Sequence, residues 1–152
     1  MVRRLAIVAL ALIGIAVGLS SSAGTFLISD DPQLIAFAVR VGLRDPSGFA
    51  DTVTSLRRSG RLPARYVAKG AAQEFGWRPG GDLCRVLPSH AIGGDRFANR
   101  EGRLPDRNGR IWSEADLDFA CGKRGPHRLV FSSDGLMFVT LDHYETFIEV
   151  PR

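Results

Sequence analysis

The chain has 152 residues, of which 45% are apolar. This composition suffices for one ordinary domain with a single hydrophobic core and a terminal extension, without a second domain. The formal net charge is +4 and the isoelectric point is near 9.7. Such a surface suits a polyanionic partner, although charge alone does not separate RNA from an acidic membrane or from a requirement for solubility.

Residues 1–23 have the three-part pattern of a secretory signal. Two arginines precede an unbroken apolar run, Leu5–Leu19, and small polar residues follow it, with a cleavage site predicted after Ala23. The run is shorter than the roughly twenty apolar residues of a membrane-spanning helix. Phe26 and Leu27 extend it, however, so an uncleaved membrane anchor is the alternative. In either case we expect the rest of the chain to lie outside the cytoplasm, secreted or anchored.

The two cysteines, Cys84 and Cys121, form an even pair in a chain predicted to leave the cytoplasm. An oxidising compartment favours a disulfide, and the sequence has no CxxC motif or Cys/His cluster that would bind zinc. Two small buried thiols are the alternative. The chain-entropy model assigns a bridge across so long a loop about 4 kcal/mol of stability. We therefore predict a structural disulfide.

Three helices are predicted between residues 27 and 75. The first covers 27–41, with Asp31-Pro32 as its start signal, and the second begins at Asp45-Pro46 and ends at Gly60. A third is predicted at 68–75, followed by a short segment at 83–86. We interpret residues 24–45 as a pro-segment or spacer, which places the folded domain at residues 46–152.

The second half of the chain changes from loop-like to strand-like composition. Residues 92–110 contain scattered glycines and arginines among Asp, Asn and Pro, and we predict a loop there. Apolar segments at 128–131, 136–141 and 145–150 favour strands, and the Asp-Gly pair between the first two indicates a hairpin. Helices followed by an antiparallel sheet predict an α+β domain in which the N-terminal helices pack on the C-terminal sheet.

Four segments resemble a known family. They read LPARYVAKGAAQEFGW, IGGDRFANREGRLPDRNGRIWSEAD, RLVFSSDGL and DHYETF, in this order and at near-constant spacing between Leu62 and Val150. Together they resemble the bacterial guanyl-specific ribonucleases, the barnase-like microbial ribonucleases. The resemblance implies a ribonuclease that cuts single-stranded RNA after guanosine, and a barstar-like inhibitor protein in the producing cell. We expect a monomer that uses no metal ion or cofactor.

The resemblance assigns the two proton transfers of RNA cleavage to Glu114 and His143. RNA supplies its own nucleophile, the ribose 2′-hydroxyl, so the enzyme needs a base for that proton and an acid for the departing 5′-oxygen. Glu114 matches the family's general base, and a glutamate is ionised near neutrality. His143 matches the general acid, since an imidazole can both hold and release a proton near neutral pH.

The residues that match the family's phosphate site are mostly cations. Arg124 and Arg128 match the two arginines that hold the scissile phosphate, for which planar guanidinium groups are well suited. Lys69 matches an additional positive charge, and Tyr144 matches a phenol that contacts the phosphate. We expect Asp116 to pair with the arginines and to fix their side chains.

Guanine recognition is assigned to the segment Phe97-Ala98-Asn99-Arg100-Glu101. The Glu101 carboxylate can accept two hydrogen bonds from the N1–H and N2–H₂ edge of guanine, whereas adenine offers no such pair of donors. Main-chain N–H groups of Ala98, Asn99 and Arg100 can meet guanine O6, and Phe97 or the Arg100 guanidinium can cover a face of the base. Ala98 replaces a hydroxyl residue of the family, so only its main chain is expected to contribute.

The segment Lys123–His127 departs most from the family pattern. Lys123 stands where the resemblance leads us to expect an aromatic residue, and Gly125-Pro126-His127 replaces a more polar stretch. His90 and His127 match no family role. We expect both to face solvent, with a place for His127 in the phosphate site as the alternative.

The sequence therefore predicts a secreted endoribonuclease that forms a 2′,3′-cyclic phosphate and then hydrolyses it to a 3′-phosphate. One alternative is a catalytically weakened RNA-binding or interaction module of the same fold, motivated by the altered Lys123–His127 segment. Another is a glycosidase that uses Glu114 and Asp116. It is disfavoured because residues two apart on one strand point the same way and form no opposed pair.

Overall fold

The computed structural model describes residues 31–152, and the predicted signal or anchor lies outside this range, as do residues 27–30 of the first predicted helix. The elements are α1 (Pro32–Val41), α2 (Pro46–Ser59), β1 (Tyr66–Val67), α3 (Lys69–Glu74), the 3₁₀ helix η1 (Leu83–Arg85), β2 (Ala91–Phe97), β3 (Trp112–Asp116), β4 (Arg128–Ser132), β5 (Met137–Thr140) and β6 (Ile148–Glu149). None of the helices within 31–152 is long and apolar enough to cross a membrane.

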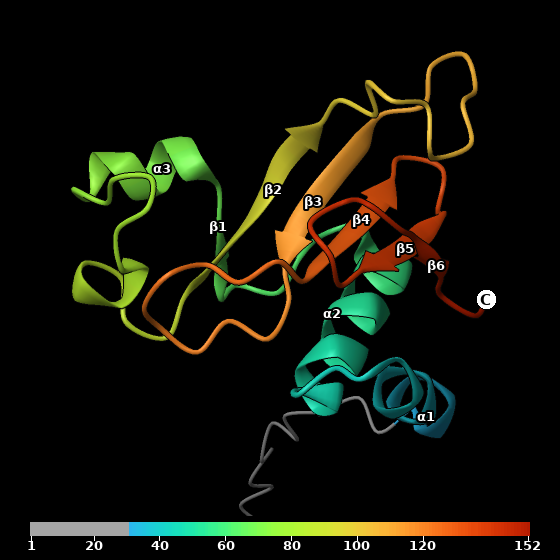
Figure 1. The fold of residues 1–152 in the computed structure, drawn as a ribbon, viewed down its shortest axis with the longest axis horizontal. Helices are drawn as coiled ribbons and strands as arrows, with labels where there is room; N and C mark the ends of the chain where they lie inside the picture. Colours follow the sequence, from blue (N-terminus) through green and yellow to red (C-terminus); the bar gives the residue numbers. More distant parts are fainter. Residues whose placement is uncertain (1–30) are drawn as a thin grey trace, which may run out of the picture.

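The strands form one six-stranded sheet in the order in which they occur along the chain. β1 runs parallel to β2, and every later pair of neighbours is antiparallel. Figure 1 shows α2 beneath β4 and β5 with α1 beside it, while α3 stands at the other end of the sheet near β1. The predicted α+β fold, with N-terminal helices packed on a largely antiparallel sheet, is confirmed.

The helix ends follow the signals in the sequence. The Asp31 carboxylate accepts hydrogen bonds from the main-chain N–H groups of Gln33 and Leu34, and Asp45 accepts one from Gly48. These side chains satisfy N–H groups that have no partner inside the helix. α2 ends at Gly60, whose left-handed φ of 68° costs glycine little. Local chemistry thus sets where both helices start and stop.

α1 belongs to the main core, although the sequence placed it outside the folded domain. Leu34, Phe37 and Ala38 are buried in one cluster with residues of α2, β4 and β5. The Phe37 ring stacks on that of Phe49 with centroids 5.7 Å apart. The packed core therefore includes α1, and the interpretation of residues 24–45 as a pro-segment or spacer stays a prediction.

We expect Phe37→Ala to lower the free energy of unfolding by about 3–5 kcal/mol, the usual cost of removing a buried phenylalanine. Val39 lies on the same helix with 62% of its surface exposed, so Val39→Ala should change stability by no more than about 0.5 kcal/mol. Urea unfolding followed by circular dichroism measures both. Equal effects of the two variants would show that α1 is not part of the cooperative unit.

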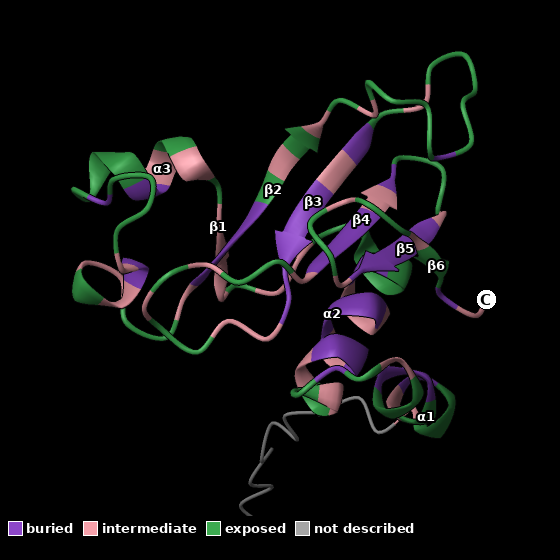
Figure 2. Ribbon diagram, in the orientation of Figure 1, coloured by how far each residue is buried: buried purple, intermediate pink, exposed green. Residues whose placement is uncertain are grey.

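The sheet buries both of its faces, and the alternation of side chains assigns each face a task. Leu129 and Val139, which are paired across β4 and β5, point into the helical core. Val130, Trp112 and Phe138 point the other way and form a second cluster. Figure 2 shows that β3, β4 and β5 are buried along most of their length. Side chains two residues apart on a strand point to the same face of the sheet, so Glu114 and Asp116 lie on this second face with Trp112.

The strand β2 corrects the prediction of a loop for residues 92–97, whereas residues 98–110 contain no helix or strand, as predicted. The first half of β2 is buried, and the strand pairs with β3 from Gly93 to Phe97 with a register shift between Gly93 and Asp95. A side chain at Gly93 would bring a Cβ to 2.7 Å from the Tyr66 ring and 3.0 Å from Ala115 Cβ, and Gly94 has a φ of 98°. The two glycines are therefore a strand bulge with close backbone packing, not a loop signal.

The ends of the sheet also differ from the sequence prediction. The two-residue strand β1 was not predicted, and β6 is limited to Ile148–Glu149, where a strand was expected from 145 to 150. Thr146 is held in a turn, because its main-chain N–H and its hydroxyl both donate to the Asp142 carboxylate. This turn removes the first residues of the predicted strand from the sheet.

The predicted disulfide is confirmed. Cys84 and Cys121 are bonded, 37 residues apart along the chain and with Cα atoms 5.5 Å apart. The bond joins η1 to the connection between β3 and β4. Among the described residues there is no free cysteine.

Candidate active site

Glu114 lies at the centre of the sheet, on β3. Its main chain is paired with Asp95 of β2 on one side and Val130 of β4 on the other, which fixes its position along the sheet. Only 6% of its surface is exposed. A carboxylate with this little solvent needs hydrogen-bonding partners from the protein.

Two side chains supply these partners. Lys69 Nζ, from the start of α3, lies 2.6 Å from Glu114 Oε1, and the Tyr144 hydroxyl donates to Oε2. Burial by itself would raise the pKa of Glu114, but the hydrogen bonds from Lys69 and Tyr144 and the charges of Lys69 and Arg128 outweigh it and hold the pKa below its ordinary value. The carboxylate is therefore ionised and acceptor-only at neutral pH.

We expect Tyr144→Phe to raise the pKa of Glu114, because the variant loses one hydrogen bond to the charged form and keeps the aromatic ring. The pH dependence of the Glu114 side-chain ¹³C chemical shift measures this change. Tyr66→Phe is the matched control, since the Tyr66 hydroxyl donates to the Asp116 carbonyl oxygen and to no oxygen of Glu114. An unchanged titration in Tyr144→Phe would contradict the role of this hydroxyl.

Asp116 joins the two predicted phosphate-binding arginines. Arg124 donates through Nε at 2.7 Å and through Nη2 at 2.5 Å, while Arg128 Nε lies 3.0 Å from Asp116 Oδ1 as an ion pair without hydrogen-bond alignment. Arg128 Nη1 also donates to the carbonyl oxygens of Gly125 and His127. Both arginines are thus held by the protein, and Asp116 is ion-paired with both of them, as expected from the sequence.

His143 and Tyr144 lie on the loop after β5, both in the left-handed conformation with φ of 58° and 76°. Such values are uncommon for residues other than glycine and persist where the surroundings hold them. Thr140 Oγ1 donates to Asp142 and accepts the N–H of Tyr144, each at 2.9 Å. Asp142 has a pKa lowered to about 2, chiefly by hydrogen bonds from Thr146. The carboxylate therefore braces the loop that presents His143.

Two hollows meet at His143. One has a volume of about 420 Å³ and is lined by the predicted base-recognition residues Phe97, Ala98, Asn99, Arg100 and Glu101, together with Arg96, Arg103, His143, Tyr144, Glu145 and Phe147. The other, of about 600 Å³, is lined by Gly80, Lys123, Arg124, Gly125, Pro126, Arg128 and His143. The imidazole thus lies between the base-recognition segment and the arginines.

The base-recognition loop is closed by its own side chains. Asn99 Nδ2 donates to the carbonyl oxygen of Leu104, and Asn99 Oδ1 accepts the N–H of Leu104, at 3.0 and 3.1 Å. The Phe97 ring stacks on Tyr144 with centroids 5.1 Å apart. These contacts fix the shape of the loop. The sequence predicted only a main-chain contribution from Asn99, whereas its side chain also stabilises the loop.

Glu101 is exposed, with 70% of its side chain accessible. Its Oε2 lies 2.9 Å from Arg103 Nε, and Arg103 Nη1 in turn donates to Glu145 and to the carbonyl oxygen of Tyr144. Arg103 therefore ties the base-recognition loop to the loop of His143. Sequence reasoning missed this arginine, and its place two residues after Glu101 was the only signal.

Comparison with known proteins decides the family. The model of the ribonuclease family matches residues 50–151. A ribonuclease of Heyndrickxia coagulans is 49% identical over 96 residues, which cover 62% of this chain and 88% of that protein. The chain belongs to the ribonuclease family. A ribonuclease of Bacillus intermedius is also 49% identical over 96 residues, and the match covers 59% of that protein.

A solved structure, of ribonuclease Sa2 with guanosine-2′-cyclophosphate, is 27% identical to this ribonuclease. It covers 74% of this chain and 90% of its own, with a TM-score of 0.41. The residues that the family model matches, 50–151, contain every residue predicted for the site.

The Tyr144 hydroxyl contacts Glu114, and the phosphate contact predicted for it stays a prediction. The surroundings of His127 differ from expectation. His127 does not face solvent freely, because its Nδ1 lies 2.7 Å from Asp118 Oδ2. It also does not line the hollow of the arginines. His90, which was also predicted to face solvent, is half-buried, with Nδ1 2.9 Å from the carbonyl oxygen of Pro88.

The glycosidase alternative needs a second carboxyl group free to act as acid or nucleophile. Asp116 is 3% exposed and is ion-paired with two arginines, so it cannot serve in this way.

Proposed function

We propose that this ribonuclease is an endoribonuclease that cuts single-stranded RNA on the 3′ side of guanosine, without a metal ion. The observation that carries the proposal is the joining of two hollows at His143, one lined by the base-recognition segment and the other by Arg124 and Arg128. A guanine in the first hollow would place its 3′-phosphate beside the arginines. The charge that a metal would otherwise supply comes from the guanidinium groups.

In the first step, the Glu114 carboxylate takes the proton of the ribose 2′-hydroxyl, and the oxygen attacks phosphorus. Arg124, Arg128 and Lys69 stabilise the additional negative charge of the phosphorane. The bond to the 5′-oxygen breaks, and the imidazolium of His143 gives that oxygen a proton. The products are a 2′,3′-cyclic phosphate and a free 5′-hydroxyl, with Glu114 protonated and His143 neutral.

In the second step, the roles of the two groups are reversed. Neutral His143 takes a proton from water, the resulting hydroxide attacks the cyclic phosphate, and protonated Glu114 returns its proton to the 2′-oxygen. This leaves a 3′-phosphate and restores both groups to their starting states. Because one group must be ionised and the other protonated, activity should follow a bell-shaped dependence on pH.

Guanine selection rests on the Glu101 carboxylate as a double acceptor and on main-chain N–H groups of the base-recognition loop, whose shape is fixed by the Asn99–Leu104 hydrogen bonds. A site built to pair with a particular set of donors and acceptors discriminates strongly, because the wrong base leaves groups without partners.

The disulfide between Cys84 and Cys121 supports secretion, since such bonds persist in oxidising compartments. A membrane anchor at residues 1–23 is the other form of an extracytoplasmic enzyme. We further propose that the enzyme acts as a monomer and that the producing cell makes a barstar-like inhibitor, because a ribonuclease active before export would be toxic.

The test is digestion of a defined single-stranded RNA, with and without EDTA, and analysis of the ends. We expect fragments with a guanosine 2′,3′-cyclic phosphate at early times and a 3′-phosphate later, in equal yield with EDTA. Ends at other nucleotides would overturn guanine selection, and loss of activity with EDTA would overturn metal independence. RNA that is bound but left intact would support the noncatalytic RNA-binding module instead.

A further inference from the structure

Arg124 lies on a connection that has little structure of its own. Residues 117–127 link β3 to β4 and contain no helix or strand. Leu117 and Phe119 anchor the start of the connection in two apolar clusters. Beyond them, Ala120, Cys121, Lys123, Gly125 and Pro126 are exposed, so apolar packing does not hold the part of the connection that carries Arg124.

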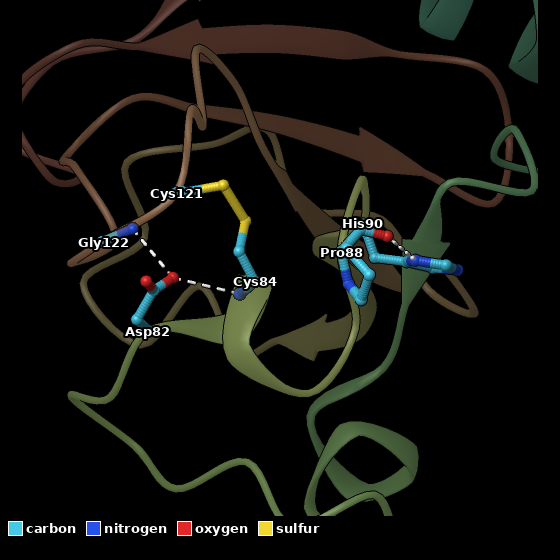
Figure 3. Close-up of a disulfide and its surroundings, with 6 residues drawn as sticks. All are labelled: Asp82, Cys84, Pro88, His90, Cys121 and Gly122. Atoms are coloured by element: carbon cyan, nitrogen blue, oxygen red, sulfur yellow. Dashed lines mark hydrogen bonds between the residues drawn. A yellow bond between two sulfur atoms is a disulfide. The ribbon is translucent and has the colours of Figure 1, made fainter.

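That part is tied to η1 by two independent links. The first is the disulfide between Cys84 and Cys121. The second is the Asp82 carboxylate, whose Oδ1 accepts the N–H of Gly122 at 2.8 Å and the N–H of Cys84 at 3.0 Å. Figure 3 shows the Asp82 side chain beside the disulfide, with hydrogen bonds to the main chain of Cys84 and of Gly122. One oxygen thus joins the two segments that the sulfur atoms also join.

The links hold a backbone conformation that the chain would not otherwise keep. Cys121 and Gly122 are consecutive left-handed residues, with φ of 70° and 80°. A cysteine seldom adopts this conformation unless its surroundings impose it. The reversal of the chain at these two residues sets the direction in which Lys123 and Arg124 leave, and Arg124 then reaches Asp116.

We infer that Asp82 and the Cys84–Cys121 disulfide are positioning groups for Arg124, acting on catalysis through the placement of its guanidinium group. The inference rests on the proposed function, in which Arg124 binds the scissile phosphate. Asp82, Cys84 and Cys121 line neither of the two hollows that meet at His143. Their effect on the rate therefore depends on Arg124 being present.

A double-mutant cycle tests this dependence, with kcat/KM for a GpN dinucleotide measured at a temperature where circular dichroism shows every variant folded. We expect Asp82→Ala, and separately Cys84→Ala with Cys121→Ala, to lower kcat/KM about tenfold or more, because small displacements of a positioned group have large kinetic effects. Asp82→Asn keeps an acceptor oxygen and should retain most of the activity. In an Arg124→Ala background, the same tether variants should change kcat/KM by less than about twofold.

Asp31→Ala is the matched control, because Asp31 Oδ1 likewise accepts two main-chain N–H groups, those of Gln33 and Leu34. It should lower the melting temperature and leave kcat/KM unchanged. The tethering role is overturned if the tether variants lower kcat/KM equally in both backgrounds, or in neither. If Arg124→Ala alone leaves kcat/KM unchanged, the phosphate-binding role of Arg124 fails, and the inference fails with it.

Reduction gives a second measurement without mutation. A dithiol such as dithiothreitol delivers two electrons and two protons, so that Cys84 and Cys121 become thiols and the reagent becomes a cyclic disulfide. The exposed Cys121 makes the bond open to attack. We expect reduction of the folded protein to lower kcat/KM as the double cysteine variant does, and to have no further effect on that variant. Full activity of the reduced protein would overturn the role of the disulfide.

Discussion

Replacing Glu114 with alanine should lower kcat for GpN cleavage by about two powers of ten or more, the usual size of a general-base contribution. His143→Ala should have an effect of the same size, because each group carries one of the two proton transfers. The expected loss corresponds to roughly 2.7 kcal/mol or more of transition-state stabilisation. Steady-state kinetics with a GpN dinucleotide measure both variants.

Glu114→Gln separates the chemistry from the packing. The amide keeps the size of the side chain and an oxygen for Lys69 or Tyr144, but it cannot take a proton from the 2′-hydroxyl. The activity should therefore fall as in Glu114→Ala, and the activity that remains should lack the acidic limb of the pH profile. That limb lies at lower pH than an ordinary glutamate would place it, because the pKa of Glu114 is lowered by Lys69 and Tyr144.

Glu149→Gln is the control for a strand carboxylate, since Glu149 lies exposed on β6 away from the cleft. It should retain full activity. Unchanged cleavage of GpN by Glu114→Ala would remove the carboxylate from the mechanism and would leave the arginines and His143 without a base.

The parts of the fold that the sequence predicted are those that depend on local chemistry. Asp31 and Asp45 cap their helices because an oxygen three atoms from the main chain reaches the first free N–H groups. The Asp134-Gly135 turn likewise lies between β4 and β5. In both cases the signal and its structural effect lie within a few residues of one another.

The errors arose where distant residues decide the outcome. Gly93 and Gly94 suggested a loop, but they lie in a strand. Gly93 is needed there because Tyr66 and Ala115 occupy the space that a side chain would fill. α1 was assigned outside the domain because the core that it shares with α2 also contains residues of β4 and β5, far along the chain. No pattern within residues 24–45 contains that information.

The candidate site shows the same division. The residues proposed to react were assigned from motifs, and of the contacts that orient them only the pairing of Asp116 with the arginines was expected. Arg103 connects Glu101 to the loop of His143, and Asp142 braces that loop, yet both are ordinary charged residues in the sequence. The hydrogen bond from the Tyr144 hydroxyl to Glu114 likewise had no signal in the sequence.

Glu101→Gln should reduce the preference for GpN over ApN, measured as the ratio of the two kcat/KM values, by about tenfold to a hundredfold. A hydrogen bond to a charged group contributes roughly 1.5–3 kcal/mol. The glutamine amide can accept from only one of the two guanine donors, and its NH₂ group faces the other. The kcat/KM for ApN should stay nearly constant, since adenine has no such pair of donors to lose.

The neighbouring Glu145 provides the comparison that isolates guanine recognition from loop stability. Glu101 and Glu145 each form an ion pair with Arg103, and each side chain is 70% exposed. Glu145→Gln weakens the same bridge between the two loops but removes no proposed guanine acceptor, so the GpN to ApN ratio should persist. A ratio lost equally in both variants would attribute selectivity to the Arg103 bridge, and a ratio intact in Glu101→Gln would place guanine recognition on the main chain of residues 98–100.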